Sequence, residues 1–262
     1  MNAAASSVRI ASLVPSISEL LAALGLAPRM VARTGFCIHP AEAMATIPKV
    51  GGTKDVNLAK LRRLAPTHAI VNVDENRRET VEALREFVPE IIVTHPNAPA
   101  DNLLLLEQLV AAFGALPGVA ERAAALGRVL RDELAHCAAR PWPGERVLYL
   151  IWREPWMTVA RDTYIARMLA QVGWQSWPAV EGGAQGAARY PVLTGDEPWL
   201  NDVERVLLSS EPYRFAAEHL PLAHSLCPNA RAQLVDGELL SWYGPRAAQG
   251  LAYLRGLAGP PQ

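Results

Sequence analysis

Hydrophobic positions in the first half of the chain alternate between two patterns. Short apolar runs rich in β-branched residues predict buried strands at 8–14, 29–35, 67–73 and 90–96. Apolar residues at steps of three and four predict helices at 16–25, 58–64, 77–87 and 102–113. Ser16 and Glu19 have the spacing of a capping box, and Gly25 is suited to end that helix. Strands that alternate with helices in this way predict a parallel sheet covered on both faces.

The second half repeats this plan loosely. Strands are expected at 146–152 and 203–211, followed by an apolar run at 232–239, and helices at 165–173 and 246–257. Asp162 and Thr163 are placed to cap the first of these helices. The stretch 182–191, rich in glycine and alanine, is expected to be a flexible loop.

One long helical pattern, at 117–140, separates the two halves. Its apolar residues include Val119, Ala123, Leu126 and Leu130, and Pro117 suits the first helical turn. A helix of about 23 residues spans roughly 35 Å, enough to join two lobes; an ordinary surface helix of one domain is the alternative that periodicity leaves open. The predicted fold class is α/β, with two parallel-sheet lobes, 1–116 and 142–262, joined by a backbone helix at 117–141.

Composition narrows the class of protein. The chain has 262 residues, half of them hydrophobic, and a net charge of −1, so a sizeable core is expected and neither nucleic acid nor an acidic membrane surface is. Three cysteines without a C-x-x-C spacing imply neither a disulfide framework nor a zinc module. No apolar run approaches the roughly 20 residues that span a bilayer. The first residues, MNAAASS, lack the features of a secretory signal, which leaves open a cytoplasmic protein or a sequence written without its signal.

Aromatic residues predict the side on which a ligand binds. Every Trp and Tyr follows the long helix, whereas the first half has only Phe36, Phe87 and Phe113. Ligands of parallel sheets bind outside the carboxyl ends of the strands. In the first half that rule selects the loops 15–18, 35–39 and 74–76, and in the second half Trp152, Arg153, Glu154, Trp156, Tyr213, Trp242 and Tyr243. Such aromatics suit a large planar or amphipathic molecule held between two lobes, although each of them could instead fill the core.

Several strings resemble one known family. They are RIASLVPSISELLAALGL, VARTGFCIHP, IPKVGGTKDVNLAKLRRLAPTHAIV, WREPWMTVARDTYIARML, RYPVL, VLLSSEPY and SWYGPR, and the resemblance extends over 8–258. The chain is similar to the helical-backbone substrate-binding proteins of ABC importers, which carry cobalamin, ferric siderophores or haem, and most similar to the cobalamin-binding branch. The resemblance implies two lobes bridged by one helix and a ligand held in the cleft and passed to a membrane permease. It also implies no catalysis, no intrinsic cofactor and a periplasmic location.

Positions that match the family imply a ligand site. Phe36, Asp74 and Glu75 would contact a cobalamin-like corrinoid or related metal chelate from the first lobe. The second lobe would supply Trp152, Arg153, Trp156, Tyr190, Tyr213, Trp242, Tyr243 and Arg246. The planar guanidinium of Arg246 suits amide or carboxylate groups on the ligand's rim, and a solvent-facing helix residue is the alternative.

Two positions depart from the family pattern. Val73 stands where cobalamin binders have an aromatic residue, and Ala59 stands where the family has a glutamate that docks the permease. Together with the missing signal, these departures leave room for a soluble receptor or a ligand-storage protein.

Other functions remain as alternatives. Cys37 and His39, with His95, offer soft ligands for direct metal binding, but their spacing matches no zinc module. Asp74, Glu75 and Glu154 could act as paired acids, although no nucleophile elbow, phosphate loop, dinucleotide fingerprint or zinc-protease motif is present. A ferric-siderophore, haem or metal-ion binding protein, or a cytoplasmic enzyme that processes corrinoids, is therefore the alternative to a non-catalytic corrinoid receptor.

Overall fold

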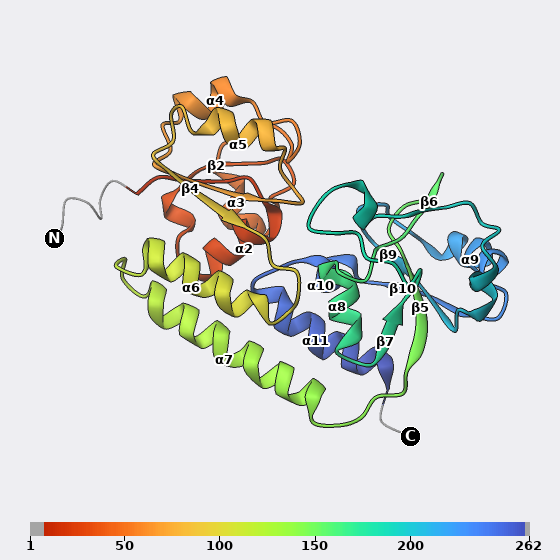
Figure 1. Cartoon of the computed structure of the whole chain (residues 1–262). Coiled ribbons are helices and arrows are strands. Elements are labelled where there is room, and N and C mark those ends of the chain that lie inside the picture. Colours follow the sequence, from red (N-terminus) through yellow and green to blue (C-terminus); the bar gives the residue numbers. More distant parts are fainter. Residues whose placement is uncertain (1–7, 260–262) are drawn as a thin grey trace. The chain divides into compact units, whose positions relative to one another are not determined.

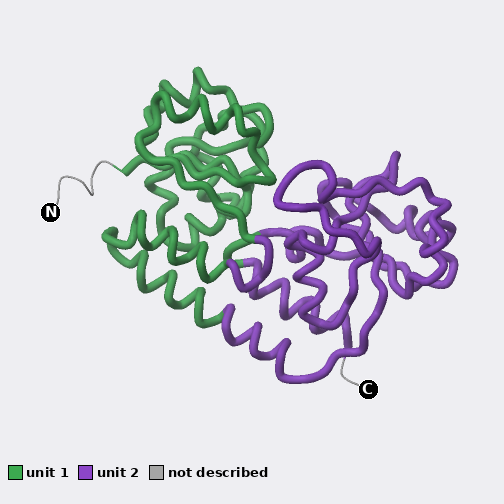
Figure 2. Tube along the Cα trace, viewed as in Figure 1, with its two compact units in different colours: residues 1–96, 102–129, 243–245 green, residues 97–101, 130–242, 246–262 purple. Residues whose placement is uncertain are grey.

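The computed structural model describes residues 8–259, which form two compact units (Figure 2). Unit 1 takes the chain up to Pro96, then Asn102–Val129 and Tyr243–Pro245. Unit 2 takes Asn97–Asp101, Leu130–Trp242 and the chain from Arg246 onward. The expectation about a secretory signal and the outer ends of the two predicted lobes lie outside the described residues.

The sheet of unit 1 is parallel and has the strand order β2-β1-β3-β4. Its strands are β1 (Ile10–Ser12), β2 (Met30–Arg33), β3 (His68–Asn72) and β4 (Glu90–Thr94). Each lies inside one of the four predicted runs, but is shorter. The β3 and β4 strands run in register from His68 opposite Glu90 to Asn72 opposite Thr94, so their carboxyl ends are level.

Helices cover both faces of this sheet, with α4 and α5 on one face and α2, α3 and α6 on the other (Figure 1). The elements are α2 (Pro15–Ala23), η1 (Ala27–Arg29), α3 (Ala41–Ala45), α4 (Leu58–Arg63), α5 (Arg78–Leu84) and α6 (Asp101–Phe113). The α4 and α5 face is closed by Leu61 and Leu84, which pack with Val50 and Val71. The predicted layering of the first lobe is confirmed, and α3 is an addition to it.

The start of α2 differs from the prediction. The helix begins at Pro15, which needs no N–H donor there, and its N-cap is Val14, so Ser16 does not cap it. The hydroxyl of Ser18 instead donates to Ser12 Oγ at 2.8 Å and lies 3.1 Å from Val14 O. The predicted capping box is therefore wrong. The predicted end is correct, because Gly25 has φ +78° and its N–H bonds back to Ala22 O.

Unit 2 contains a second parallel sheet with the order β10-β9-β5-β7. Its strands are β5 (Glu145–Leu150), β7 (Trp174–Ser176), β9 (Arg205–Ser209) and β10 (Arg231–Val235), and a small antiparallel pair is formed by β6 (Trp156–Met157) and β8 (Val192–Leu193). The patterns did not indicate β6, β7 or β8. The predicted α/β class with two parallel sheets is confirmed.

The helices of unit 2 are short except for the last. They are α8 (Tyr164–Ala170), α9 (Leu220–Leu226), α10 (Gly237–Ser241) and α11 (Pro245–Ala258), with 3-10 turns η2 (Ala187–Arg189), η3 (Pro198–Asp202) and η4 (Ala217–His219). Thr163 caps α8 as predicted, accepting from Ala166 N. Asp162 does not cap it and instead accepts from Gly182 N at 2.8 Å.

The long helix is α7 (Val119–Ala138), and the boundary between the two units falls inside it. It begins two residues later than predicted, because Gly118 has φ +77° and Pro117 precedes the helix. Arg122 donates to Leu24 O within unit 1, and Glu133 accepts from Arg255 of α11 within unit 2. Across residues 8–259, no helix combines the length and the apolar character needed to cross a membrane.

Candidate functional site

The carboxyl ends of the unit 1 strands are joined by the amide of Asn76. Its Oδ1 accepts from Asn72 N at 2.9 Å, and its Nδ2 donates to Leu13 O and to Thr53 O. The loops after β1 and β3 are thus held together with the segment at Thr53 by one buried side chain. The predicted loop 74–76 is therefore fixed in position before any ligand arrives.

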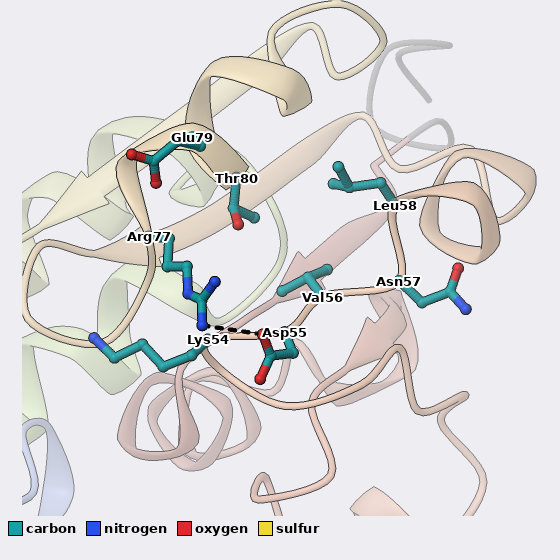
Figure 3. A pocket seen from close by; sticks show the side chains of 8 residues that line it. All are labelled: Lys54, Asp55, Val56, Asn57, Leu58, Arg77, Glu79 and Thr80. Atoms are coloured by element: carbon teal, nitrogen blue, oxygen red, sulfur yellow. Dashed lines mark ion pairs between the residues drawn. The ribbon is translucent and has the colours of Figure 1, made fainter.

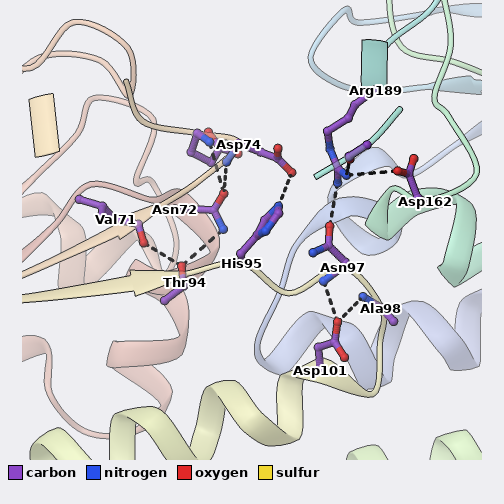
Figure 4. Close-up of polar contacts among 12 residues, drawn as sticks. Val71, Asn72, Asp74, Thr94, His95, Asn97, Ala98, Asp101, Asp162 and Arg189 are labelled. Carbon is purple, nitrogen blue, oxygen red and sulfur yellow. Dashed lines mark hydrogen bonds and ion pairs between the residues drawn. The ribbon is translucent and has the colours of Figure 1, made fainter. Parts of the chain in front are cut away.

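Asp74 and Glu75 lie in this fixed loop. Both backbone N–H groups donate to Asn72 Oδ1, and Asp74 Oδ2 lies 3.4 Å from His95 Nε2 (Figure 4). Lys54 Nζ also donates to Asp74 O at 2.6 Å. The Asp74 side chain is consequently a largely buried partner of an imidazole, which the alternative of a solvated helix start did not anticipate.

Phe36 is the most exposed of the predicted residues in unit 1. Its side chain is 63% exposed, next to the exposed Ile38, whereas Cys37 between them is fully buried. Cys37 Sγ lies 3.1 Å from Thr34 Oγ1, and burial raises the pKa of its thiol, which disfavours the thiolate that binds metals. Within residues 8–259, no three His, Cys, Asp or Glu side chains are grouped to hold a metal ion, and His39 belongs to no such group.

The three cysteines are alike in being buried. Cys37, Cys137 and Cys227 are all buried and unbridged. Burial raises the pKa of Cys137 and raises that of Cys227 to about 12. These thiols are small buried residues, not reactive ones.

Unit 1 also has an open pocket of about 530 Å³ at the start of α4 and α5 (Figure 3). Its lining consists of Lys54, Asp55, Val56, Asn57, Leu58, Arg77, Glu79 and Thr80. Arg77 and Asp55 form an ion pair of 3.2 Å across it. None of the predicted ligand residues lines this pocket, so it is separate from the site that the patterns select.

In unit 2 the predicted residues Trp152, Trp156 and Tyr213 belong to one aromatic cluster, together with Phe215 and His219. Trp152 packs edge-on against Tyr213 at 5.6 Å between ring centroids, and Trp156 stacks on Phe215 at 6.0 Å. Trp152 is 41% exposed, while Trp156 and Tyr213 also pack on the core of the unit. The cluster thus combines a structural role with one exposed ring after β5, as a ligand platform requires.

His219, which the sequence did not select, contacts the hydroxyl of Tyr213. Its Nδ1 lies 2.9 Å from Ala216 N, and its Nε2 lies 3.1 Å from Tyr213 Oη. The same Nδ1 lies 3.2 Å from Ala216 O, so the imidazole contacts both backbone groups of Ala216 as well as the Tyr213 hydroxyl. His219 therefore holds the Tyr213 ring from its hydroxyl end.

Trp242 is held by a second residue that sequence reasoning missed. Its Nε1 donates to Glu211 Oε1 at 2.7 Å, and Ser241 Oγ donates to the same oxygen at 2.7 Å. Trp242 is only 8% exposed and Tyr243 is also buried, and Tyr243 is grouped with unit 1. The only signal for Glu211 was its place at the end of the predicted strand 203–211.

The remaining predicted residues are Arg153, Arg246 and Tyr190. Arg246 Nη1 lies 2.8 Å from Glu238 Oε2, and its guanidinium carbon lies 4.8 Å from the Trp242 ring centroid. Arg153 pairs with Glu154 at 2.9 Å, so Glu154 is a partner of an arginine and not of another acid. Tyr190 is half-buried and follows η2.

Close packing places the Glu211 loop. The buried Tyr149 hydroxyl donates to Ser209 Oγ at 2.9 Å, and Gly237 N donates to Ser210 Oγ at 2.8 Å. A Cβ at position 237 would collide with Ser209 Oγ and with Glu211 N and Cγ. Glycine is therefore required there for Glu211 to reach Trp242.

We expect the buried Glu211 to make the stability of the protein depend on pH. Burial raises the pKa of Glu211 above its ordinary value of 4.5, and Glu238 and Asp236 act in the same direction. The folded chain then holds a proton that the unfolded chain has lost, so Glu211 lowers stability as pH rises from about 4.5 through the folded pKa. The substitution Glu211→Gln should remove this loss of stability. The free energy of unfolding of the variant should therefore increase relative to that of wild type as pH rises. Urea unfolding between pH 4 and 8 measures the effect.

The control for this experiment is Glu218→Gln, which changes an exposed glutamate of the same unit. Its stability relative to wild type should show a much smaller trend with pH. A parallel trend in both variants would assign the effect to net charge and not to the burial of Glu211.

Comparison with known proteins identifies the family. A profile described as periplasmic binding protein matches residues 10–197, most of the chain. The chain belongs to the periplasmic binding protein family. Among the similar solved structures is the periplasmic vitamin B12 binding protein BtuF of Vibrio cholerae, with a TM-score of 0.78 and 19% identity over 95% of this chain and 96% of that one.

Two other similar structures belong to haem-binding proteins. RhuT from Roseiflexus sp. RS-1 has a TM-score of 0.73 and 22% identity over 96% of this periplasmic binding protein and 97% of RhuT. HutB of Vibrio cholerae has a TM-score of 0.75 and 21% identity over 97% and 99%. No curated protein sequence matches significantly. The structural similarity to these proteins establishes the fold. The predicted family and fold class are confirmed.

Proposed function

We propose that this periplasmic binding protein captures a cobalamin-like corrinoid for an ABC importer, without catalysing a reaction. The observation that carries the proposal is the exposed Trp152 ring, supported edge-on by Tyr213 at the carboxyl end of the unit 2 sheet. A planar macrocycle buries its apolar face well against such a ring. The similarity to a vitamin B12 binding protein supports a corrinoid as the ligand. The similarity to haem-binding proteins makes haem the ligand with which a corrinoid must be compared.

The other predicted ligand residues complete the proposal. Phe36, Asp74 and Glu75 of unit 1 are proposed to contact the ligand, with Tyr190, Trp242, Tyr243 and Arg246. Phe36 resembles Trp152 in being an exposed aromatic side chain in a loop after a strand. Buried Trp242 and Tyr243 are proposed to shape the site and not to offer broad faces.

The partner proposed is an ABC permease, and the location proposed is the periplasm. Ala59 lies exposed on α4 at the position where the family resemblance implies a docking glutamate. Its neighbours on the helix include Lys60, Arg62 and Arg63. Docking by this chain would therefore rest on carboxylates elsewhere, or on a permease whose surface differs from the family pattern.

Titration of the purified protein tests the function. Cyanocobalamin and cobinamide are added while intrinsic Trp fluorescence is followed, calorimetry gives the stoichiometry, and haem and a ferric siderophore serve as comparators. Saturable binding of one corrinoid per chain is expected. Binding of haem or the siderophore alone would change the ligand, and recovery of a chemically altered corrinoid would contradict the absence of catalysis.

Trp152→Ala should weaken corrinoid binding by about 1–2 kcal/mol, roughly 5- to 30-fold, because the exposed ring is removed from the proposed site. Calorimetry measures the change. The matched control is Trp142→Ala, a half-buried tryptophan before the amino end of β5, where its indole donates to Cys137 O. Equal affinities for wild type and Trp152→Ala would remove Trp152 from the site.

A further inference from the structure

The charge beside Trp242 is already neutralised. Arg246, the cation assigned to the ligand's polar rim, forms a 2.8 Å ion pair with Glu238, and both side chains are largely buried. The guanidinium also lies over the Trp242 ring. A carboxylate on a ligand would have to compete with Glu238 for this arginine.

Further carboxylates lie near this pair. The Glu211 carboxyl lies beside the indole, where its Oε1 accepts from Trp242 Nε1 and Ser241 Oγ. Asp236 caps α10 by accepting from Leu239 N, which places it at the same end of that helix as Glu238. Three carboxyl groups, those of Glu238, Glu211 and Asp236, therefore lie in the segments that hold Trp242 and Arg246.

The second arginine of the predicted site is paired in the same way. Arg153 Nη2 lies 2.9 Å from Glu154 Oε1, directly after β5. Arg214, which directly follows Tyr213, is an exposed cation of unit 2 that a charged ligand could also use. The experiment must therefore separate it from Arg246.

Carboxylates and amides on the edge of a ligand would interact differently with this rim. A carboxylate brought to this rim meets like charges, and displacing Glu238 from Arg246 would leave a partly buried acid without its cation. A primary amide carries two donors and one acceptor, so it bonds to the carboxylate and guanidinium of an intact pair without changing the local charge. An acidic rim with a closed ion pair thus favours uncharged amides.

We propose that Glu238 is a specificity-determining residue, which keeps Arg246 neutralised and makes the site select chelates with amide edges over chelates with carboxylate edges. The inference rests on the proposed function, whose site it refines.

Two corrinoids with the same macrocycle provide the test. Dicyanocobinamide carries amide side chains, whereas dicyanocobyrinic acid carries carboxylates. Calorimetry at pH 7.5 should give at least about 10-fold tighter binding of the amide form by wild type. High salt should lower the ratio of the affinity for the amide form to the affinity for the carboxylate form, because it screens the repulsion between the carboxylate ligand and the rim.

Four variants locate the effect. Glu238→Gln should raise affinity for the carboxylate form and narrow the ratio at least about fivefold, while Glu238→Asp, which keeps the charge, should retain most of the selectivity. Glu218→Gln, which removes one exposed charge elsewhere, should leave the ratio unchanged. Arg214→Gln in the Glu238→Gln background should leave the gained affinity in place, because Arg246 provides it.

The outcomes separate the inference from the function. Equal binding of both corrinoids by wild type, or an unchanged ratio in Glu238→Gln, would overturn the selectivity and leave corrinoid capture standing. Loss of the gained affinity in the double variant with Arg214→Gln would also overturn it. Binding of neither corrinoid by wild type would contradict the proposed function, and the inference would fall with it.

Discussion

Replacing Arg189 by alanine should lower the stability of unit 2 by about 3 kcal/mol, since the loss of one partner from a buried charged network leaves the others unpaired. Arg189 is 1% exposed. Its Nη1 donates to Gly183 O at 2.8 Å, its Nη2 donates to Asn97 Oδ1 at 2.8 Å, and Asp162 Oδ2 lies 4.0 Å away (Figure 4). One guanidinium therefore joins the loop before η2 to Asn97–Asp101.

The measurement must resolve the units, because a chain of two units need not unfold in one transition. Hydrogen exchange followed by mass spectrometry reports the opening of each segment, and the peptides at 182–191 and 97–101 should lose the most protection. Arg167→Ala, on the exposed side of α8, is the control and should change stability by less than about 0.5 kcal/mol. Equal protection in Arg189→Ala and wild type would contradict the structural role.

Trp174→Ala should destabilise the same unit by about 3–5 kcal/mol, the cost of a cavity left by a large buried aromatic side chain. Trp174 is 1% exposed in the edge strand β7, and the Arg205 guanidinium carbon lies 4.6 Å from the ring centroid. Arg205 in turn bonds to both oxygens of Glu145. The substitution therefore removes apolar contact and exposes a buried ion pair.

Urea unfolding followed by far-UV circular dichroism measures this loss. Gln175→Ala is the control, because Gln175 is the exposed neighbour of Trp174 on the same strand. It should have little effect. A loss below about 1 kcal/mol in Trp174→Ala would show that β7 adds little to the sheet.

The sequence predicted the strands that lie within long apolar runs. Runs such as THAIVNV around β3 are rich in β-branched residues, and this composition identifies a buried strand. The three residues of β7, WQS, are too short and too polar at the centre to form such a run. The leucine-rich α9 was missed because Pro221 and two polar residues interrupt its spacing. Length and local composition therefore set what the pattern could show.

Which side chains of the candidate site lie together was predictable only where their position along a strand decides it. Trp152 and Tyr213 follow β5 and β9, and the structure brings their rings together. Glu211 also follows β9, but its bond to Trp242 spans 31 residues. Arg189 reaches Asn97 across 92 residues, from a stretch whose composition suggested only flexibility. Such contacts depend on tertiary structure, which periodicity does not contain. The roles of all the predicted site residues at a ligand stay predictions.

The buried cysteines give the protein internal reporters. Cys37 lies in unit 1, whereas Cys137 and Cys227 lie in unit 2, and each is shielded from solvent. A thiol reagent reaches them only when the surrounding structure opens, so the rate of labelling at each position measures how often that region exposes its interior. Mass spectrometry after brief labelling would then distinguish a ligand that stabilises one unit from a ligand that stabilises both, without any added probe.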